Sequence, residues 1–319
     1  MANTNLRIAQ KAKSDEFYTQ LTDIEKEMRH YKDFFKGKVV YCNCDDARES
    51  NFFKYFSLNF EHLGLKKLIT TGYKADGKGV VLIYEGDKNG NRIVEDSEIV
   101  TKELEGNGDF RSAECIEFLK ECDVVVTNPP FSLFREYVAQ LMEYGKKFLI
   151  IGNQNAITYK EIFIHIKNNK LWLGVHSNKT MEFSMPMNYE SDVIVGNRKI
   201  GKVPAISWFT NIDHKKHNEP LDLYRKYDAT AYPKYDNYDA IEVSKTCDIP
   251  MDYEGIMGVP ITFLDKYCPT QFEIVDGANR YLILDYFNVN SKIKSEHSHC
   301  CNINGNAKYF RILIRKISN

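Results

Sequence analysis

The chain has 319 residues, of which 43% are hydrophobic and 13% aromatic, and its formal net charge is −1. This composition is that of a folded globular protein, and it excludes a disordered or fibrous chain and a non-specific polycation. The chain shows neither a signal peptide nor an apolar run that could span a bilayer, so we expect a cytoplasmic protein. Eight cysteines without regular spacing predict free thiols and no disulfides.

The first third of the chain alternates predicted helices and strands. Thr22–Glu25 has the spacing of a capping box and predicts the start of a helix that ends at Gly37. Lys38–Cys42 then reads as a buried strand, Ser50–Leu63 as a helix and Leu65–Thr71 as a second strand. A strand, a helix and a further strand in this order form the unit that builds parallel sheets.

The next segments continue this rhythm. Val80–Tyr84 and Arg92–Val94 flank a glycine-containing turn and predict a hairpin. Cys122–Thr127 and Phe148–Ile151 read as buried strands on either side of a helix over residues 133–145. We therefore predict an α/β fold with a doubly wound, mostly parallel sheet.

Polar loops follow several of the predicted strands. Ligands of a doubly wound sheet bind at the carboxyl ends of its strands, so we expect the loops at Asn43, Asp109 and Asn128 to converge. Beyond about His214 the sequence becomes rich in Tyr, Asp and Pro without a clear strand and helix rhythm. We predict a catalytic domain over residues 1–212 and a C-terminal region over residues 213–319.

The segment after the strand at residues 122–127 carries the clearest chemical signal. Asn128-Pro129-Pro130-Phe131 lies between a buried strand and a helix, a setting that favours a functional loop over an ordinary Asn-Pro turn. Two prolines stiffen the loop, and the Asn128 side-chain oxygen and the Pro129 carbonyl can then accept the two hydrogens of an exocyclic amine. Such acceptors draw the nitrogen toward tetrahedral geometry as positive charge develops on it.

The asparagine form of this tetrapeptide resembles the catalytic motif of methyltransferases that act on the amino group of adenine. The chain also resembles the EcoRI-like adenine-specific DNA methyltransferase family over nearly its whole length. The stretches that carry this resemblance are Val40–Asp46, Ile151–Ile162, Trp208–Asn211, Tyr235–Ala240 and Gly258–Lys266. It implies a sheet of the S-adenosylmethionine-dependent methyltransferase type, S-adenosylmethionine as cofactor, and methyl transfer to the 6-amino group of an adenine extruded from duplex DNA. We then expect the C-terminal region over residues 213–319 to be a target-recognition region that helps to select the DNA sequence.

The resemblance also suggests the cofactor contacts. Asp15–Thr19 resembles the cofactor-binding segment before the first strand, and Gly108–Phe110 resembles the loop whose acid accepts a hydrogen bond from the cofactor's adenine amine. Asn43–Asp46 replaces the usual glycine-rich turn, and we expect Asp45 or Asp46 to bind the methionine ammonium group while the ribose partner stays open. The expected cofactor set is Phe17, Tyr18, Thr19, Asn43, Asp45, Asp46, Asp109, Phe110 and Asn128.

Charge is unevenly distributed along the chain. Glu85–Asp123 holds twelve acids and five bases, whereas Lys160–Lys216 holds nine bases and five acids. We expect the second segment to contact DNA phosphates, although a solvated surface is about equally consistent with the charges alone. The expected DNA-binding residues are Arg198, Lys199, Lys202, Lys215 and Lys216.

Other interpretations of the same motifs stay open at this stage. The same chemistry could serve an rRNA base or a protein glutamine, and a DNA-binding protein could keep the fold without turnover. Trp208–Asn211 could touch the target base or form a core strand with a polar end. His297–Cys301 has crowded ligands and no matching pair nearby, so we expect no metal site. Besides duplex DNA, the family resemblance allows a restriction endonuclease of the same specificity as a partner, and we expect no membrane partner.

Overall fold

The computed structural model of the chain describes residues 18–185, 193–195, 198–278 and 300–317. The chain divides into two compact units, the first made of Met1–Gln154 and His176–Ile212 and the second of Asn155–Val175 and Asp213–Asn319. A single boundary was predicted from the sequence, after residue 212. In the structure, residues 155–175 also group with the second unit. Within the described ranges, no helix has the length and apolar character needed to cross a membrane.

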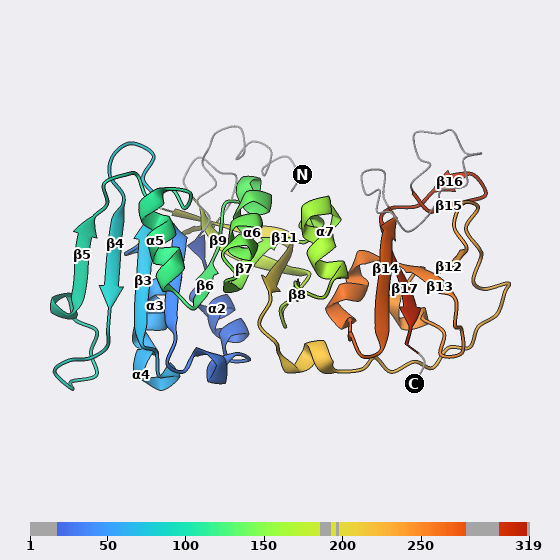
Figure 1. Cartoon of the computed structure of the whole chain (residues 1–319), viewed down its shortest axis with the longest axis horizontal. Coiled ribbons are helices and arrows are strands. Elements are labelled where there is room, and N and C mark those ends of the chain that lie inside the picture. Colours follow the sequence, from blue (N-terminus) through green and yellow to red (C-terminus); the bar gives the residue numbers. More distant parts are fainter. Residues whose placement is uncertain (1–17, 186–192, 196–197, 279–299, 318–319) are drawn as a thin grey trace. The chain divides into compact units, whose positions relative to one another are not determined.

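The first unit alternates strands and helices over most of its length (Figure 1). Its strands are β1 (Tyr18–Thr19), β2 (Val39–Asp45), β3 (Lys67–Gly72), β4 (Val80–Tyr84), β5 (Ile99–Glu103), β6 (Val124–Thr127), β7 (Lys147–Asn153), β9 (Lys179–Met185), β10 (Val193–Val195) and β11 (Arg198–Thr210). Its helices are α2 (Leu21–Met28), α3 (Asn51–Leu58), α4 (Phe60–Leu63), α5 (Ala113–Glu121) and α6 (Phe134–Glu143), with 3-10 turns η1 (Lys32–Phe35), η2 (Asp96–Glu98) and η3 (Phe131–Leu133).

These strands form one mixed sheet in the order β1-β9-β11-β7-β6-β2-β3-β4-β5. The four central strands β7, β6, β2 and β3 are parallel, and the strands that flank them on both sides run antiparallel. The predicted doubly wound, mostly parallel sheet is confirmed in its centre. Among the antiparallel pairs at its edges, the sequence suggested only a hairpin at β4, whereas β11 pairs with β7, and β1 with β9, across long stretches of intervening chain.

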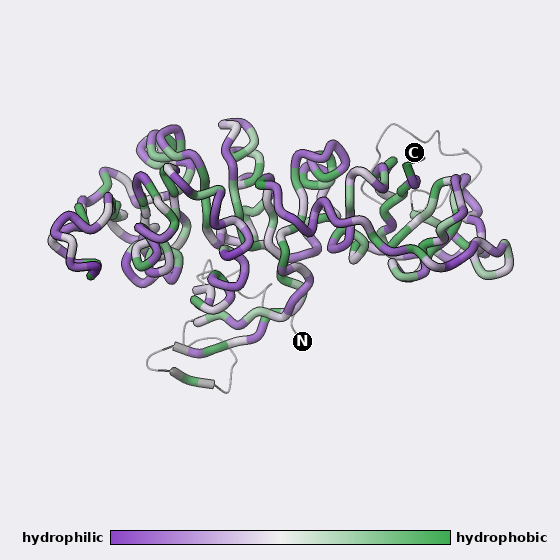
Figure 2. The backbone as a smooth tube through the Cα atoms, turned by 90° about the horizontal axis from the view of Figure 1, so that it is seen from below, coloured by the Kyte–Doolittle hydropathy of each residue, from purple (hydrophilic) through white to green (hydrophobic). Residues whose placement is uncertain are grey.

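Alternate residues of the central strands face opposite sides of the sheet. Val40, Val126 and Ile151 pack in one core with Ile24 and Met28 of α2 and with the aromatic side chains of α3. Tyr41 faces the other side, where its ring lies 6.2 Å from that of Phe118 in α5. Helices therefore cover both faces, which explains why the central strands are almost continuously hydrophobic. Figure 2 shows hydrophobic and hydrophilic stretches alternating along the chain.

Several predicted element boundaries differ from the structure. Helix α2 begins at Leu21 after Gln20, which makes no side-chain cap, so the capping box at Thr22 is wrong. Strand β2 continues through Asn43 to Asp45, whereas the sequence suggested a loop there. The partner of β4 is β5 and not Arg92–Val94, because the connection is stabilised by Asp87, which accepts hydrogen bonds from the backbone of Gly90 and Arg92.

The second unit contains a smaller sheet in the order β12-β13-β17-β14. Its elements are α7 (Lys160–Lys167), β8 (Trp172–Leu173), β12 (Ala240–Glu242), β13 (Ile256–Val259), β14 (Phe272–Ala278), β15 (Asn302–Ile303), β16 (Asn306–Ala307) and β17 (Arg311–Lys316), with 3-10 turns η4 (Gln154–Thr158), η5 (Lys215–Asn218), η6 (Thr246–Asp248) and η7 (Ile261–Lys266). Helix α7 belongs to this unit because the Phe163 ring packs edge-on against that of Phe310, with centroids 5.5 Å apart.

A buried ion pair joins two strands of this smaller sheet. Arg311 in β17 places Nη2 2.7 Å from Oε1 of Glu242 in β12, and Tyr235 donates its hydroxyl to the other oxygen of the same carboxylate. The Glu242 carboxylate also accepts a hydrogen bond from Ser244. The Arg311 side chain is therefore largely buried in an ion pair within the second unit and is not a solvent-exposed cation near the C-terminus.

Candidate active site

The strand order reverses between β2 and β6. From β2 the chain crosses to β3 on one side, and from β6 it crosses through α6 to β7 on the other side. Ligands of doubly wound sheets bind at such a reversal, beyond the carboxyl ends of the strands. The residues that leave β6 at this point are Asn128-Pro129-Pro130-Phe131.

The tetrapeptide is largely enclosed. Asn128 is only 7% exposed, and Pro129 is buried. The Pro130 carbonyl accepts a hydrogen bond from the backbone of Leu133 at 3.0 Å, which forms the short turn η3 before α6. Phe131 is half-buried and packs against the core below the sheet edge. The loop is therefore anchored at both ends, so its backbone acceptors have fixed positions.

Asn43 connects the ends of β2 and β6. Thr127 donates its hydroxyl to the Asn43 carbonyl, and Tyr137 of α6 donates its hydroxyl to the Asn43 side-chain oxygen. Burial raises the pKa of Tyr137 well above its ordinary value, so its hydroxyl stays protonated and acts as a donor. The Asn43 side-chain oxygen is thus engaged by Tyr137 and positions the strand end, and the contact of Asn43 with the cofactor stays a prediction.

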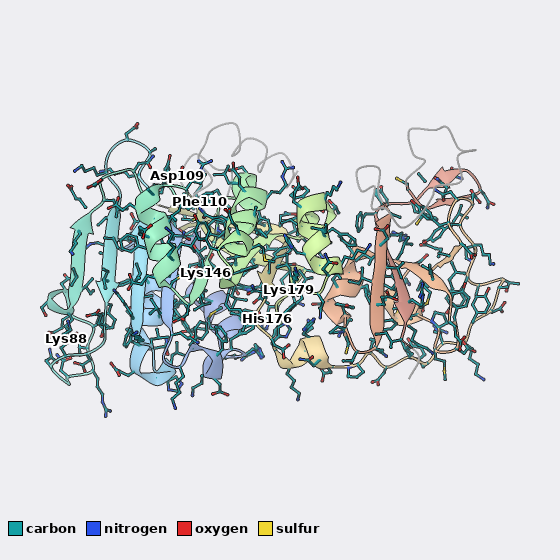
Figure 3. All side chains as sticks on the ribbon, viewed as in Figure 1. Lys88, Asp109, Phe110, Lys146, His176 and Lys179 are labelled. Atoms are coloured by element: carbon teal, nitrogen blue, oxygen red, sulfur yellow. The ribbon has the colours of Figure 1, made fainter. Side chains whose placement is uncertain are left out.

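The Asp109 loop reaches the same region from the far side of β3. Gly108 has a φ of +81°, and a Cβ added there would lie 2.3 Å from the carbonyl oxygen of Gly72 at the end of β3. Phe110 is buried and meets the Tyr137 ring edge-on, with centroids 5.0 Å apart. The structure thus brings the loops at Asn43, Asp109 and Asn128 together through Tyr137 and Thr127, and Figure 3 shows Asp109 and Phe110 at the edge where these strands end.

The Asp109 carboxylate carries a close ion pair. Oδ2 lies 2.6 Å from Nη2 of Arg111, and Oδ1 accepts hydrogen bonds from both Nε and the backbone nitrogen of Arg111 at 2.9 Å. These hydrogen bonds to Arg111 are the main reason that the pKa of Asp109 lies below its ordinary value. The carboxylate is therefore ionised and oriented, with 27% of the side chain still exposed.

The short strand β1 adds a further polar group to this edge. The backbone oxygen of Thr19 accepts a hydrogen bond from Asn51 at 2.7 Å, which ties β1 to the first residue of α3. The Thr19 hydroxyl oxygen is buried, and it has no hydrogen-bond partner among the described residues. Such a group costs about 1–3 kcal/mol unless a ligand satisfies it. Thr19 therefore fits its predicted role, while Phe17 lies outside the described residues.

Asp45 or Asp46 was expected to bind the methionine ammonium group. The backbone of Asp45 pairs with that of Gly72, but its side chain lies outside the described residues. Asp46 is exposed, and its Oδ1 accepts hydrogen bonds from the backbone of Arg48 and Glu49 at 2.9 Å each. That oxygen of Asp46 therefore stabilises the turn before α3.

Sequence reasoning missed three residues at this edge. Tyr137 looked like one member of a helical apolar stripe, and Arg111 like one base in an acidic segment. Gln154 follows β7 and is 3% exposed, with a buried Nε2 that has no partner in the described part of the chain. Its position directly after a buried strand, like that of Asn128 after β6, was the available signal. Trp208, by contrast, is fully buried in the core, so Trp208–Asn211 is a core strand end.

The expected DNA-binding residues have different environments. Lys202 is exposed and pairs loosely with Glu182 at 3.5 Å, and Lys215 is exposed. Lys216 instead donates to Asp265 at 2.6 Å and to the Val175 carbonyl at 2.8 Å. Lys199 is half-buried, and the side chain of Arg198 lies outside the described residues. Arg198, Lys199 and Lys202 belong to the first unit, and Lys215 and Lys216 belong to the second.

The chain is similar to known proteins over nearly its whole length. The family model described as "Adenine-specific methyltransferase EcoRI" matches residues 5–317. Type II methyltransferase M.EcoRI of Escherichia coli is 50% identical to the chain, over 98% of this chain and 96% of that protein. M.MpnI of Mycoplasma pneumoniae is 43% identical over 98% of each chain, and M.MgeORF184P of Mycoplasma genitalium is 42% identical over 97% of each.

The chain belongs to the EcoRI adenine-specific methyltransferase family. It is an adenine-specific DNA methyltransferase, as the resemblance implied, and the interpretation as a catalytically silent relative is not supported. Among solved structures, a putative RNA methyltransferase from Pyrococcus horikoshii matches 58% of this chain and 81% of its own, at 14% identity and a TM-score of 0.30. The assignment of the fold rests on the sheet order and not on that similarity.

Proposed function

We propose that the protein transfers a methyl group from S-adenosylmethionine to the 6-amino group of adenine in duplex DNA, at the edge formed by β2 and β6. The single observation that carries this proposal is the position of Asn128-Pro129-Pro130-Phe131 at the strand reversal of a chain from this family. The buried Thr19 hydroxyl and Gln154 Nε2, both without partners in the described residues, fit a polar ligand at the same edge.

The cofactor would be held by residues from three loops. Asp109 offers an ionised acceptor for an adenine amine, Phe110 lies beside it, and Thr19 offers a hydroxyl. The rest of the expected set is Phe17, Tyr18, Asn43, Asp45, Asp46 and Asn128, and Tyr137 holds the Asn43 side chain near the end of β2. Bound S-adenosylmethionine supplies an electrophilic methyl group, and the chain supplies the geometry of its approach.

The acceptors of the tetrapeptide would act on the other reactant. The adenine amine is a weak nucleophile because its lone pair is delocalised into the ring. The Asn128 side-chain oxygen and the Pro129 carbonyl would accept its two hydrogens and favour tetrahedral nitrogen, and they interact most strongly once the nitrogen becomes positively charged. No side chain with a raised or lowered pKa is needed as a general base, because the methylated amine is acidic enough to release its proton to water.

The target adenine has to leave the duplex to reach these acceptors. Extrusion of a base costs on the order of a few kcal/mol. Stacking on an aromatic ring contributes roughly 1–3 kcal/mol, and Phe131 offers such a ring beside Asn128. The second unit would select the DNA sequence, and a restriction endonuclease that cuts the same sequence would be the partner whose activity the methylation blocks.

Base-resolved mapping of 6-methyladenine tests this proposal. We expect the genome of a host that expresses the protein to carry 6-methyladenine at one short recurring sequence. A host that expresses Asn128→Ala should lack it. Methylation only of RNA or protein, or none in either host, would contradict the proposal.

The exposed lysines give a separate prediction about affinity. Lys202→Ala and Lys215→Ala should each weaken binding to cognate and unrelated duplexes alike, and each should reduce the salt slope by about one unit, because one DNA phosphate is no longer neutralised. Lys216→Ala is unsuitable for this test because it also removes the ion pair with Asp265. Fluorescence anisotropy at several salt concentrations measures both quantities. Unaltered affinity and slope would show that these lysines are solvated surface.

A further inference from the structure

Arg111 is a heavily engaged cation at the active-site edge, and no sequence motif gave it a role. Its guanidinium contacts both oxygens of Asp109, and its Nη1 lies 3.1 Å from Oε2 of Glu136 on α6. The guanidinium carbon lies 5.2 Å from the centre of the Phe110 ring. One side chain thus links the Asp109 loop, the buried aromatic residue after Asp109 and the helix after the catalytic tetrapeptide.

The hydrogen bonds that the Asp109 carboxylate accepts show how much of its acceptor capacity the described residues use. An ionised carboxylate offers about four acceptor positions, two on each oxygen. Within the described part of the chain, Oδ1 is used twice, by the backbone nitrogen and by Nε of Arg111, whereas Oδ2 is used once, by Nη2. One acceptor position on Oδ2 is therefore left for a ligand by the described residues, on a side chain that is 27% exposed.

The planar fork of arginine gives this contact its direction. Two parallel N–H donors on one guanidinium fix the plane of the carboxylate, which a single ammonium group cannot do. The fork also holds the carboxylate ionised, because the hydrogen bonds to Arg111 lower the pKa of Asp109. Without Arg111 the Asp109 side chain would gain rotational freedom, and its open acceptor would no longer point in one direction.

We infer that Arg111 is a positioning residue for recognition of the cofactor's adenine: it orients Asp109 so that the open position on Oδ2 accepts the 6-amino group. This inference rests on the proposed role of Asp109 as the acceptor for that amine. Arg111 then contributes to selection between adenine and a purine without the amine, although it does not touch the cofactor in this scheme. Glu136 holds the outer end of the guanidinium and contributes less.

Calorimetric titration with two ligands tests this inference. The ligands are S-adenosylhomocysteine and S-inosylhomocysteine, which differ at the 6-position, where the second has a carbonyl instead of the amine. The wild-type protein should bind the first about tenfold or more tightly than the second, as expected for a hydrogen bond to a charged group. In Arg111→Ala this ratio should fall toward one, with affinity for S-adenosylhomocysteine about tenfold lower.

Three further variants separate the outcomes. Arg111→Lys keeps the charge but loses the fork, so its ratio should be intermediate, and it provides the test if Arg111→Ala does not fold. Glu136→Ala removes only the outer contact and should keep most of the wild-type ratio. Asp109→Ala should lose the ratio. If Asp109→Ala keeps the wild-type ratio, the proposed role of Asp109 is wrong. If Asp109→Ala loses the ratio while both Arg111 variants keep it, the inference about Arg111 alone is overturned.

Discussion

Asn128→Ala should lower the rate of methyl transfer about 100- to 1000-fold, with little change in cofactor affinity. The Asn128 oxygen interacts most strongly with the amine when positive charge has developed, so its loss raises the barrier more than it weakens ground-state binding. A reduction of this size corresponds to the removal of one preorganised donor or acceptor at a developing charge. Single-turnover kinetics, with enzyme and cofactor in excess over duplex, measure the chemical step directly.

Asn128→Gln is a matched variant for this experiment. It keeps the amide but moves it by one methylene, and a misplacement of that order can cost about 100-fold in rate. Both variants should bind cofactor within about twofold of the wild type and unfold at a similar temperature, because the proposed cofactor contacts come mainly from Thr19, Asp109 and Phe110. Near-normal turnover of Asn128→Ala would remove Asn128 from the catalytic site.

Gly108→Ala should destabilise the protein by roughly 2–4 kcal/mol and weaken cofactor binding by about tenfold or more. Gly108 has a φ of +81°, in a region where a side chain is strained, and a Cβ there would lie 2.3 Å from the Gly72 carbonyl oxygen. Neither backbone can move without displacing the other, so relief of the clash would shift the loop that carries Asp109. Chemical denaturation and cofactor titration measure the two effects.

Gly106→Ala provides the control within the same loop. A Cβ at Gly106 would meet nothing within 4 Å, so the substitution should change stability by less than about 1 kcal/mol and leave cofactor affinity unaltered. Equal effects of the two substitutions would show that the close approach of Gly108 to Gly72 does not position the loop.

The centre of the sheet could be predicted because its strands carry a strong local signal. Val124–Thr127 is buried on both faces and reads as a short apolar run. The edge strand β5 gave no such signal, because only Ile99 among its residues is even half-buried. Its pairing with β4 depends on backbone hydrogen bonds and on a loop arranged around Asp87, and neither feature appears in hydrophobic periodicity.

The site was predictable where a motif follows a buried strand. Asn128 could be selected in this way, whereas Asp109 was selected through the family resemblance of Gly108–Phe110, and the structure brings the two loops together. The end of β2 could not be predicted as strand. The hydroxyls that donate hydrogen bonds to the carbonyl and the side-chain oxygen of Asn43 belong to Thr127 and Tyr137, which are distant in sequence. Arg111 was missed for a similar reason: it lies in a loop, its partner Glu136 lies on α6, and only the folded loop shows the geometry of its contact with Asp109.

The most direct test of the central claim is nucleoside analysis after transfer of a labelled methyl group. The purified protein is incubated with methyl-labelled S-adenosylmethionine and genomic duplex DNA, and the DNA is digested to nucleosides. We expect the label in N6-methyldeoxyadenosine, with at least a roughly 100-fold lower rate for Asn128→Ala. Label in a methylated cytosine, or equal labelling by the wild type and Asn128→Ala, would contradict the assignment of Asn128-Pro129-Pro130-Phe131 as the site of adenine methylation.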